Sequence, residues 1–237
     1  MIRILVLLAA CAAGQPAFDV ASIRASEARG QEFVQASPGS VIMRNISLRG
    51  CVKWAYRVME YQVSGPEWMG FERFDISAKA GDAVGEDQLR LMMQTLLHDR
   101  FGLALHHETK EMQAYALVVA KGGPKFRESA EEGEMDFQPD KGRMAVKVAR
   151  AQVGMLADIL YNVLHAPVID QTGLKGRYDV TIDIGKYILD KPPDSAMDIT
   201  AMLINGLQEE LGLKLESKKM PLDLLVVDRV EKKPVEN

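Results

Sequence analysis

The sequence predicts an α+β fold made of two duplicated β-α-β-β-α-β-β units, with mostly antiparallel or mixed sheets packed on helices. Two observations lead to this prediction. Stripes of apolar residues at helical spacing alternate with short strand-like runs bounded by glycine, proline and polar residues. The order of elements in the first half of the chain then recurs in the second half, with nearly constant spacing between equivalent residues.

The first unit contains two helices that the sequence marks clearly. Ser47 is expected to cap the first helix, whose apolar stripe consists of Leu48, Cys51, Val52, Ala55 and Tyr56. The second helix is expected over 86–101, and Gly102 is the glycine that ends it. A polar loop is expected over 27–39, and two strands joined by a short turn over 103–121. Further strands are expected over 17–24, 40–46, 61–64 and 74–78.

The second unit repeats this order. Its first helix has the same apolar stripe 105 residues later, formed by Val153, Leu156, Ala157, Leu160 and Tyr161. Arg177–Val180 repeats Arg73–Ile76, and a helix over 199–211 ends at Gly212. The paired strands recur in weaker form over 211–232, and short strands are expected over 143–148 and 167–169. The expected division is a signal peptide (1–14), a first unit with an N-terminal strand (15–121), an acidic linker (122–140), a second unit (141–232) and a polar tail (233–237).

The N-terminus predicts export to the periplasm or the cell exterior. The apolar run Ile4–Ala10 follows one basic residue and precedes small residues, as in a short signal peptide. Leu8–Cys11 also fits a bacterial lipobox, so acylation of Cys11 would anchor the mature protein to lipid. A cut within Ala12–Gly14 would instead release a soluble chain that starts near Gln15. The sequence leaves both cleavages open.

Composition restricts the classes of partner. The formal net charge of −4 argues against nucleic acid binding. No apolar run in the mature chain approaches the roughly 18–20 residues that an integral membrane helix needs. Without Cys11, Cys51 is the remaining cysteine, and its place in a helical apolar stripe predicts a buried, inert thiol.

Histidines supply the main candidate for catalysis. His107-Glu108 begins like the zinc motif H-E-x-x-H, but the second histidine is absent and the segment reads as a strand. A cluster of His98, His106 and His107 would suit a hydrolase of unrecognised type, whereas exposed polar side chains are the simpler interpretation. We therefore expect no catalytic residue, no metal and no cofactor.

An aromatic and apolar cluster gives the candidate interaction patch. Trp68, Met69 and Phe71 lie in a loop after the turn-forming Gly65-Pro66. If exposed, they would form a contact surface of the kind that protein interfaces favour. The alternative is that they cover the core of the first unit.

Several long motifs resemble those of a known family. FDVASIR, GPEWM, RFDISAKA, DQTGLKGRYDVTID and the two strand-pair segments are similar to sequences of the acidobacterial soil-associated secreted proteins, a family of unknown function. A similar domain is attached to membrane metallopeptidases of the antibiotic-sensor type, which implies an extracytoplasmic location. The resemblance supplies no catalytic residue. Each half also resembles weakly the short N-terminal domains of secretins and TonB-dependent receptors, which bind protein partners.

The resulting expectation is an exported, non-enzymatic module that binds an envelope protein, peptide or glycan through exposed sheet edges or the Trp68 loop. Two alternatives remain. One is the histidine-based hydrolase, and the other is an extracytoplasmic sensory domain that acts through a separate partner.

Overall fold

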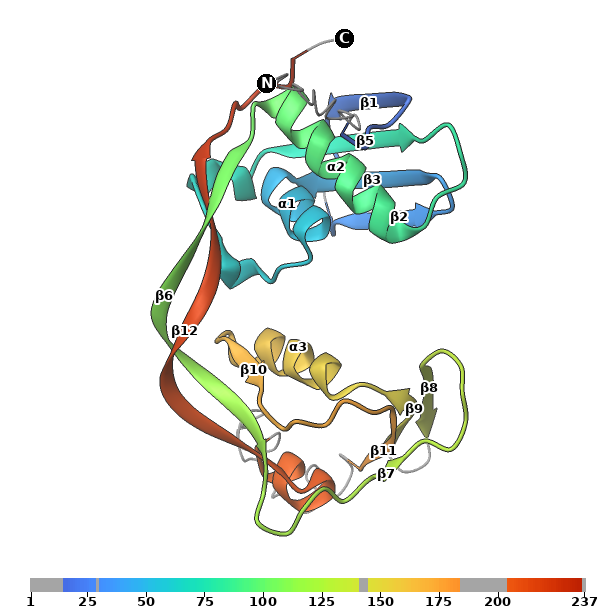
Figure 1. Ribbon diagram of the computed structural model, residues 1–237, viewed down its shortest axis with the longest axis vertical. Coiled ribbons are helices and arrows are strands. Elements are labelled where there is room, and N and C mark those ends of the chain that lie inside the picture. Colours follow the sequence, from blue (N-terminus) through green and yellow to red (C-terminus); the bar gives the residue numbers. More distant parts are fainter. Residues whose placement is uncertain (1–14, 29, 141–144, 184–203, 236–237) are drawn as a thin grey trace, which may run out of the picture. The chain divides into compact units, whose positions relative to one another are not determined.

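The computed structural model describes residues 15–28, 30–140, 145–183 and 204–235, and it confirms the α+β fold with mixed and antiparallel sheets. The described residues form two compact units (Figure 1). The first unit combines the chain up to Thr109 with the chain from Asp223 onward, and the second comprises Lys110–Leu222. The expected signal peptide with Cys11, and residues 199–203 of the helix expected over 199–211, lie outside the described residues.

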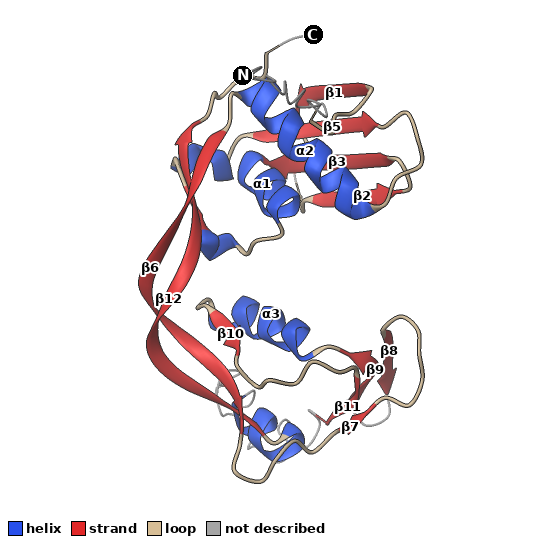
Figure 2. Cartoon of the chain, viewed as in Figure 1, coloured by secondary structure: helices blue, strands red, loops and turns tan. Residues whose placement is uncertain are grey.

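The first unit contains an antiparallel sheet with the strand order β1-β5-β3-β2. Helices α1 (Leu48–Tyr56) and α2 (Glu86–Phe101) cover one face of this sheet (Figure 2). The strands are β1 (Val20–Ala25), β2 (Phe33–Ser37), β3 (Ser40–Ser47) and β5 (Arg73–Lys79). Two short 3₁₀ turns, η1 (Glu60–Gln62) and η2 (Glu67–Gly70), lie between α1 and β5.

The structure confirms the predicted start of α1 and the predicted end of α2. The Ser47 hydroxyl accepts a hydrogen bond from the Gly50 N–H at 3.0 Å and caps α1. Gly102 ends α2 in the left-handed conformation with φ of 58°, which glycine adopts without a side-chain clash. Residues of both helices and of β3 and β5 then form one buried core, which includes Met43, Leu97 and Phe101.

Strand β2 differs from the expectation of a loop over 27–39. Val34 and Ala36 point inward and pack against the core, whereas their neighbours face solvent. Gly39, with φ of 74°, makes the tight connection from β2 to β3. The segment is polar overall, so its two inward residues gave too weak a pattern to predict a strand.

The second unit contains the antiparallel sheet β7-β11-β9-β8, helix α3 (Val153–Leu164) and the π-helical turn η3 (Leu207–Leu211). The strands are β7 (Arg127–Glu128), β8 (Asp136–Asp140), β9 (Ala145–Ala151) and β11 (Tyr178–Asp183). Two of them, β7 and β8, lie in the segment 122–140, which the sequence predicted to be an acidic linker. The side chains there are mostly exposed, but the backbone pairs with β11 and β9.

A shared β-bulge supports the duplication of the two units. In the first unit, Asn45 has φ of 49°, and its N–H donates to Asp75 Oδ1 at 2.9 Å across the interruption in the β3–β5 register. In the second unit, Arg150 has φ of 58°, and its N–H donates to Asp179 Oδ1 at 3.1 Å. The aspartate of the repeated Arg-Phe/Tyr-Asp motif therefore holds the same irregular strand in both units.

The largest departure from expectation concerns the two predicted strand pairs. Each is one continuous strand, β6 (Ala104–Val119) and β12 (Leu213–Arg229), and no turn interrupts either. The sheet order is β10-β6-β12-β4, in which β4 (Val63–Ser64) and β10 (Val168–Asp170) pair in parallel with their neighbours. The expected turn in the first copy lacks glycine, proline and asparagine, so no residue there favours a reversal.

Candidate binding site along the free edge of β1

Strand β1 lies at one edge of the four-stranded sheet of the first unit. Among the described strands, none pairs with the outer side of β1, because β1 is the terminal strand of its sheet. Ala21 and Ile23 pack against the core, while the Val20 side chain is 68% exposed. Side chains along β1 alternate between the core and solvent. A ligand beside this strand could therefore contact both its backbone edge and some of its apolar side chains.

A groove of about 670 Å³ follows this edge. One wall is β1, and the opposite side is formed by Arg100 at the end of α2 and by the C-terminal segment Lys232–Val235. Phe74 of β5 also lines the groove, and its ring packs edge-on against Phe101 with centroids 5.1 Å apart. The site is therefore a mixed polar and apolar channel beside an unpaired strand.

Arg100 connects the walls of the groove. Its backbone carbonyl accepts from the Val235 N–H at 2.7 Å, and its Nη1 donates to the Val235 carbonyl at 2.6 Å. Its Nη2 lies 3.5 Å from the Ala21 carbonyl, which is at the long limit of a hydrogen bond. The Ala21 carbonyl thus keeps hydrogen-bonding capacity for a ligand, while the C-terminal segment is held firmly.

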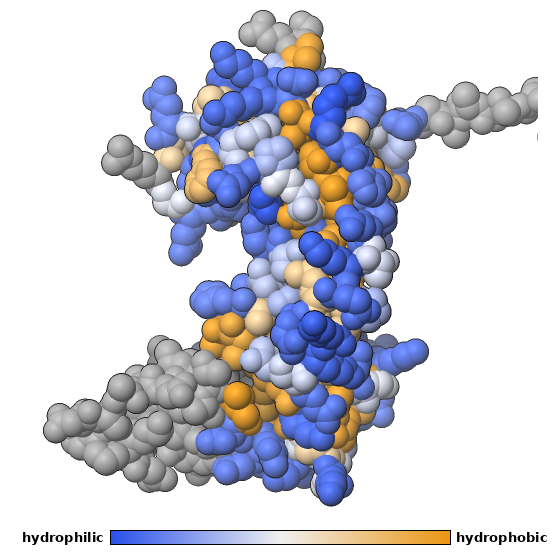
Figure 3. All heavy atoms as spheres, turned by 90° about the vertical axis from the view of Figure 1, so that its left-hand side faces the viewer, coloured by the Kyte–Doolittle hydropathy of each residue, from blue (hydrophilic) through white to orange (hydrophobic). Residues whose placement is uncertain are grey.

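The charge of the groove is positive. Arg100, Lys232 and Lys233 line it together with one carboxylate, Glu72, which pairs with Lys232 at 2.5 Å. This cationic lining contrasts with the formal charge of −4 of the whole chain. On the face drawn in Figure 3, hydrophobic areas lie between larger hydrophilic ones.

The residues of the predicted Trp68 patch do not share one environment. Met69 is fully buried, Trp68 is partly buried against the core, and Phe71 is 74% exposed. The 3₁₀ turn η2 separates them in this way, because its tight turns point neighbouring side chains in different directions. Phe71 alone presents a large apolar surface to solvent at this point.

The three histidines do not form a catalytic group around a common groove. His98 Nδ1 lies 2.9 Å from Asp99 Oδ1, and His106 Nδ1 lies 2.9 Å from Asp228 Oδ1. All three histidine side chains are exposed, and the depression that His98 lines includes neither His106 nor His107. Within the described parts of the chain, no three histidine, cysteine, aspartate or glutamate side chains are grouped to hold a metal ion.

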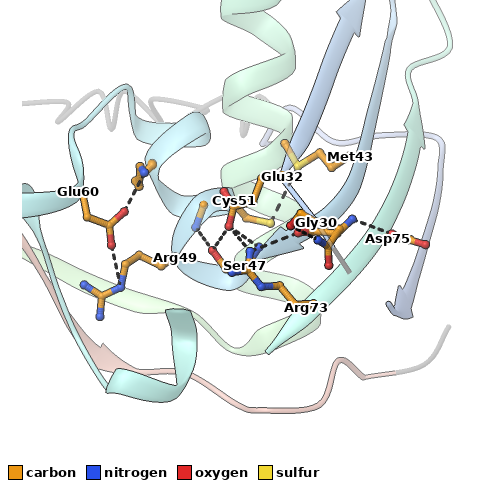
Figure 4. A network of polar contacts seen from close by, with 12 residues as sticks. Gly30, Glu32, Met43, Ser47, Arg49, Cys51, Glu60, Arg73 and Asp75 are labelled. Carbon is orange, nitrogen blue, oxygen red and sulfur yellow. Dashed lines mark hydrogen bonds and ion pairs between the residues drawn. The ribbon is translucent and has the colours of Figure 1, made fainter. Parts of the chain in front are cut away.

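A partly buried polar network beside Cys51 has a structural role (Figure 4). Glu32 Oε1 accepts from the Ser47 hydroxyl at 2.6 Å and from the Ser47 N–H at 3.1 Å, and it also pairs with Arg73. Cys51 is fully buried; burial, and secondarily the charge of Glu32, raises the pKa of its thiol far above the ordinary value. The thiol is therefore protonated and inaccessible, as the helical stripe predicted.

Sequence reasoning missed the groove itself. The end of the chain was expected to be a frayed polar segment, but Glu231 N–H donates to the Phe101 carbonyl at 2.7 Å, and Val235 is bonded to Arg100. Backbone hydrogen bonds of this kind leave no pattern in side-chain polarity. The one sequence signal was Pro234-Val235, a rigid apolar pair within an otherwise charged end.

The described residues contain no helix with the length and apolar character needed to cross a membrane. No curated protein and no solved structure matches the chain. A family model described as protein of unknown function (DUF3738) matches residues 49–230, a range that includes all of β12 and the helices of both units except Leu48 at the start of α1. The chain therefore belongs to the DUF3738 family of proteins of unknown function.

Proposed function

We propose that this protein is an exported, non-enzymatic binding module of the cell envelope, and that it binds an extended polypeptide segment by strand addition to β1. The groove along the free edge of β1 is the observation that carries this proposal. An added strand satisfies backbone donors and acceptors that an edge strand leaves unpaired, and adjacent side chains then fit the groove. Among envelope proteins, peptides and glycans, an extended polypeptide matches this surface best.

The lining of the groove favours acidic side chains in the ligand. Arg100, Lys232 and Lys233 place three cations along it, against the single carboxylate of Glu72. The exposed parts of Ala21, Ile23 and Ala25 add apolar contacts. We expect a segment in which apolar and acidic residues alternate, because alternate residues of a strand face opposite sides.

Export is part of the same proposal and rests on the apolar N-terminal run and the small residues after it. Mass spectrometry of the mature N-terminus from the native host tests it. An acylated Cys11 would show a lipid-anchored protein, and a start near Gln15 would show a soluble exported one. A chain recovered intact from Met1 would contradict export.

The binding proposal is tested with short peptides that tile the envelope proteins of the native host. Binding is followed by amide chemical shifts of the isotopically labelled protein. We expect bound peptides to shift the amides of Val20–Ala25, with acidic peptides bound more tightly than basic ones. Shifts confined to other strands would contradict the β1 site, and binding of glycans without any peptide binding would replace the polypeptide ligand with a carbohydrate.

A matched pair of charge reversals separates the groove from general electrostatics. Lys233→Glu reverses an exposed charge in the groove, and Lys121→Glu makes the same change at an exposed position in the other unit. Each exposed charge contact contributes up to about 1 kcal/mol, and reversal replaces this attraction with a repulsion of similar size. The Lys233 variant should therefore bind acidic peptides about tenfold more weakly, which corresponds to about 1.4 kcal/mol. The Lys121 variant should bind as the parent does.

A further inference from the structure

The two long strands each contribute to both compact units. The beginning of β6 belongs to the first unit, where Leu103, just before the strand, is buried and Leu105 packs against the same core. The end of β6 belongs to the second unit, where Leu117 is fully buried and Val119 packs beside it. One strand therefore supplies apolar residues to two separate cores.

Strand β12 does the reverse. Its beginning buries Leu213 in the second core, with Leu215 packed against it. Its end buries Leu225 in the first core, with Val227 packed against it. Each core thus contains the beginning of the long strand from its own repeat and the end of the long strand from the other repeat.

The short parallel strands show the same crossed pattern. β4, from the first repeat, pairs with the end of β12, with Val63 opposite Leu225. β10, from the second repeat, pairs with the end of β6, with Val168 opposite Tyr115. In both units, an acceptor strand of one repeat is occupied by a segment donated by the other (Figure 1).

We infer that β6 and β12 are opened hairpins whose second arms have been exchanged between the two repeats. Each repeat carries the sequence of both arms, but the chain runs straight through the position of the turn. This is strand exchange within one chain, analogous to the exchange of identical elements in domain-swapped dimers. Each unit is consequently completed by a segment from the other half of the chain.

The middle of the two strands is consistent with a former turn. Leu213 follows Leu103 by 110 residues, but Leu225 follows Leu117 by only 108, so a length difference of two residues falls between the arms. Turns accept such changes more readily than the interior of a strand. The stretch is mostly exposed and polar in β6, whereas in β12 it also contains the buried residues Met220 and Leu222. Thr109 Oγ1 donates to Asp223 Oδ1 at 2.8 Å between the two strands.

Site-directed cross-linking of the full chain tests the exchange, with Cys11 replaced by serine and Cys51 left buried. His106 and Asp228 are exposed and in contact, so the pair His106→Cys and Asp228→Cys should be joined by a short bifunctional thiol reagent. Ala120 occupies in the first repeat the position of Asp228 in the second, so it would lie opposite His106 in a closed hairpin. In the exchanged fold, His106 lies near the start of the continuous strand β6 and Ala120 directly follows its end, so the pair His106→Cys and Ala120→Cys should stay unlinked.

The second unit provides an independent pair. Gln113 Nε2 donates to Ser217 Oγ at 2.7 Å, and both side chains are exposed. We expect Gln113→Cys and Ser217→Cys to be linked as well, and both products to have the mass of a single chain. Linking of residues 106 and 120 would show a closed hairpin, and no linking of either expected pair would overturn the exchange. Linked products with twice the mass would show exchange between two copies, and would overturn exchange within one chain.

Discussion

A leucine-to-alanine substitution at the end of β6 or β12 should destabilise the unit formed mainly by the other repeat. Leu225 is 2% exposed and packs in the first core, although it belongs to the second repeat. Leu117 is fully buried in the second core, although it belongs to the first repeat. Removing three buried carbon atoms leaves a cavity, and such substitutions cost about 3 kcal/mol.

Native-state hydrogen exchange locates this loss. Some amides exchange only when the whole affected unit opens. A loss of about 3 kcal/mol in the free energy of opening lowers the protection factors of these amides about a hundredfold. We expect Leu225→Ala to act on amides of α1, α2 and β3, and Leu117→Ala to act on amides of α3. The reasoning would be refuted if Leu225→Ala lowered protection in α3 and left α2 unchanged, because that outcome would place the end of β12 in its own repeat.

Further predictions concern the helix ends and the bulge. Gly102→Ala should cost about 1 kcal/mol in urea unfolding, since the left-handed backbone disfavours a side chain, while no neighbour lies within 3.7 Å of the added Cβ. Gly212→Ala should cost clearly more, because its Cβ would lie 2.0 Å from the Gly123 carbonyl oxygen; equal losses would contradict this packing. Ser47→Ala should cost about 1 kcal/mol by loss of the cap, and no loss would show that the cap is unimportant. The hydrogen bond from the Asn45 N–H lowers the pKa of the Asp75 carboxyl below its ordinary 3.8. That stabilisation is present above this value and is lost as pH falls through the lowered folded pKa, so Asp75→Asn should lose less stability than the parent between about pH 5 and pH 2.

The features that the sequence predicted correctly depend on neighbouring residues. The Ser47 cap, the apolar stripe of α1 and the left-handed glycine at the end of α2 each arise within one or two turns of helix. A helix satisfies its backbone hydrogen bonds internally, so its position can be recognised without knowing its neighbours. The burial of Cys51 follows from the same stripe.

The features that the sequence predicted wrongly depend on distant partners. β2 and β8 contain few apolar residues, and what makes them strands is the pairing of their backbone with β3 and β9. The exposed segment in the middle of β6 has no turn-forming residue. The apolar residues at the two ends of β6 nevertheless suggested two separate strands joined by a turn. Only the arrangement of strands shows that these ends pack in different cores.

The candidate site shows the same division. The aromatic cluster around Trp68 was visible in the sequence, but the 3₁₀ turn η2 buries Met69 and exposes Phe71. The groove beside β1 joins residues near both ends of the chain, and backbone hydrogen bonds between Arg100 and Val235 hold one wall of it. Side-chain patterns carry no record of such long-range backbone contacts.

By itself, the sequence determined the α+β class, the internal duplication, the helices with their caps and the family of the chain. These follow from local periodicity, from residues with special backbone preferences and from repeated motifs. Only the tertiary structure decided which strands are neighbours, which arm completes which unit and where a strand edge remains free. The physical reason is that a β-strand must find its hydrogen-bond partners outside its own segment, and the two repeats offer nearly equivalent partners.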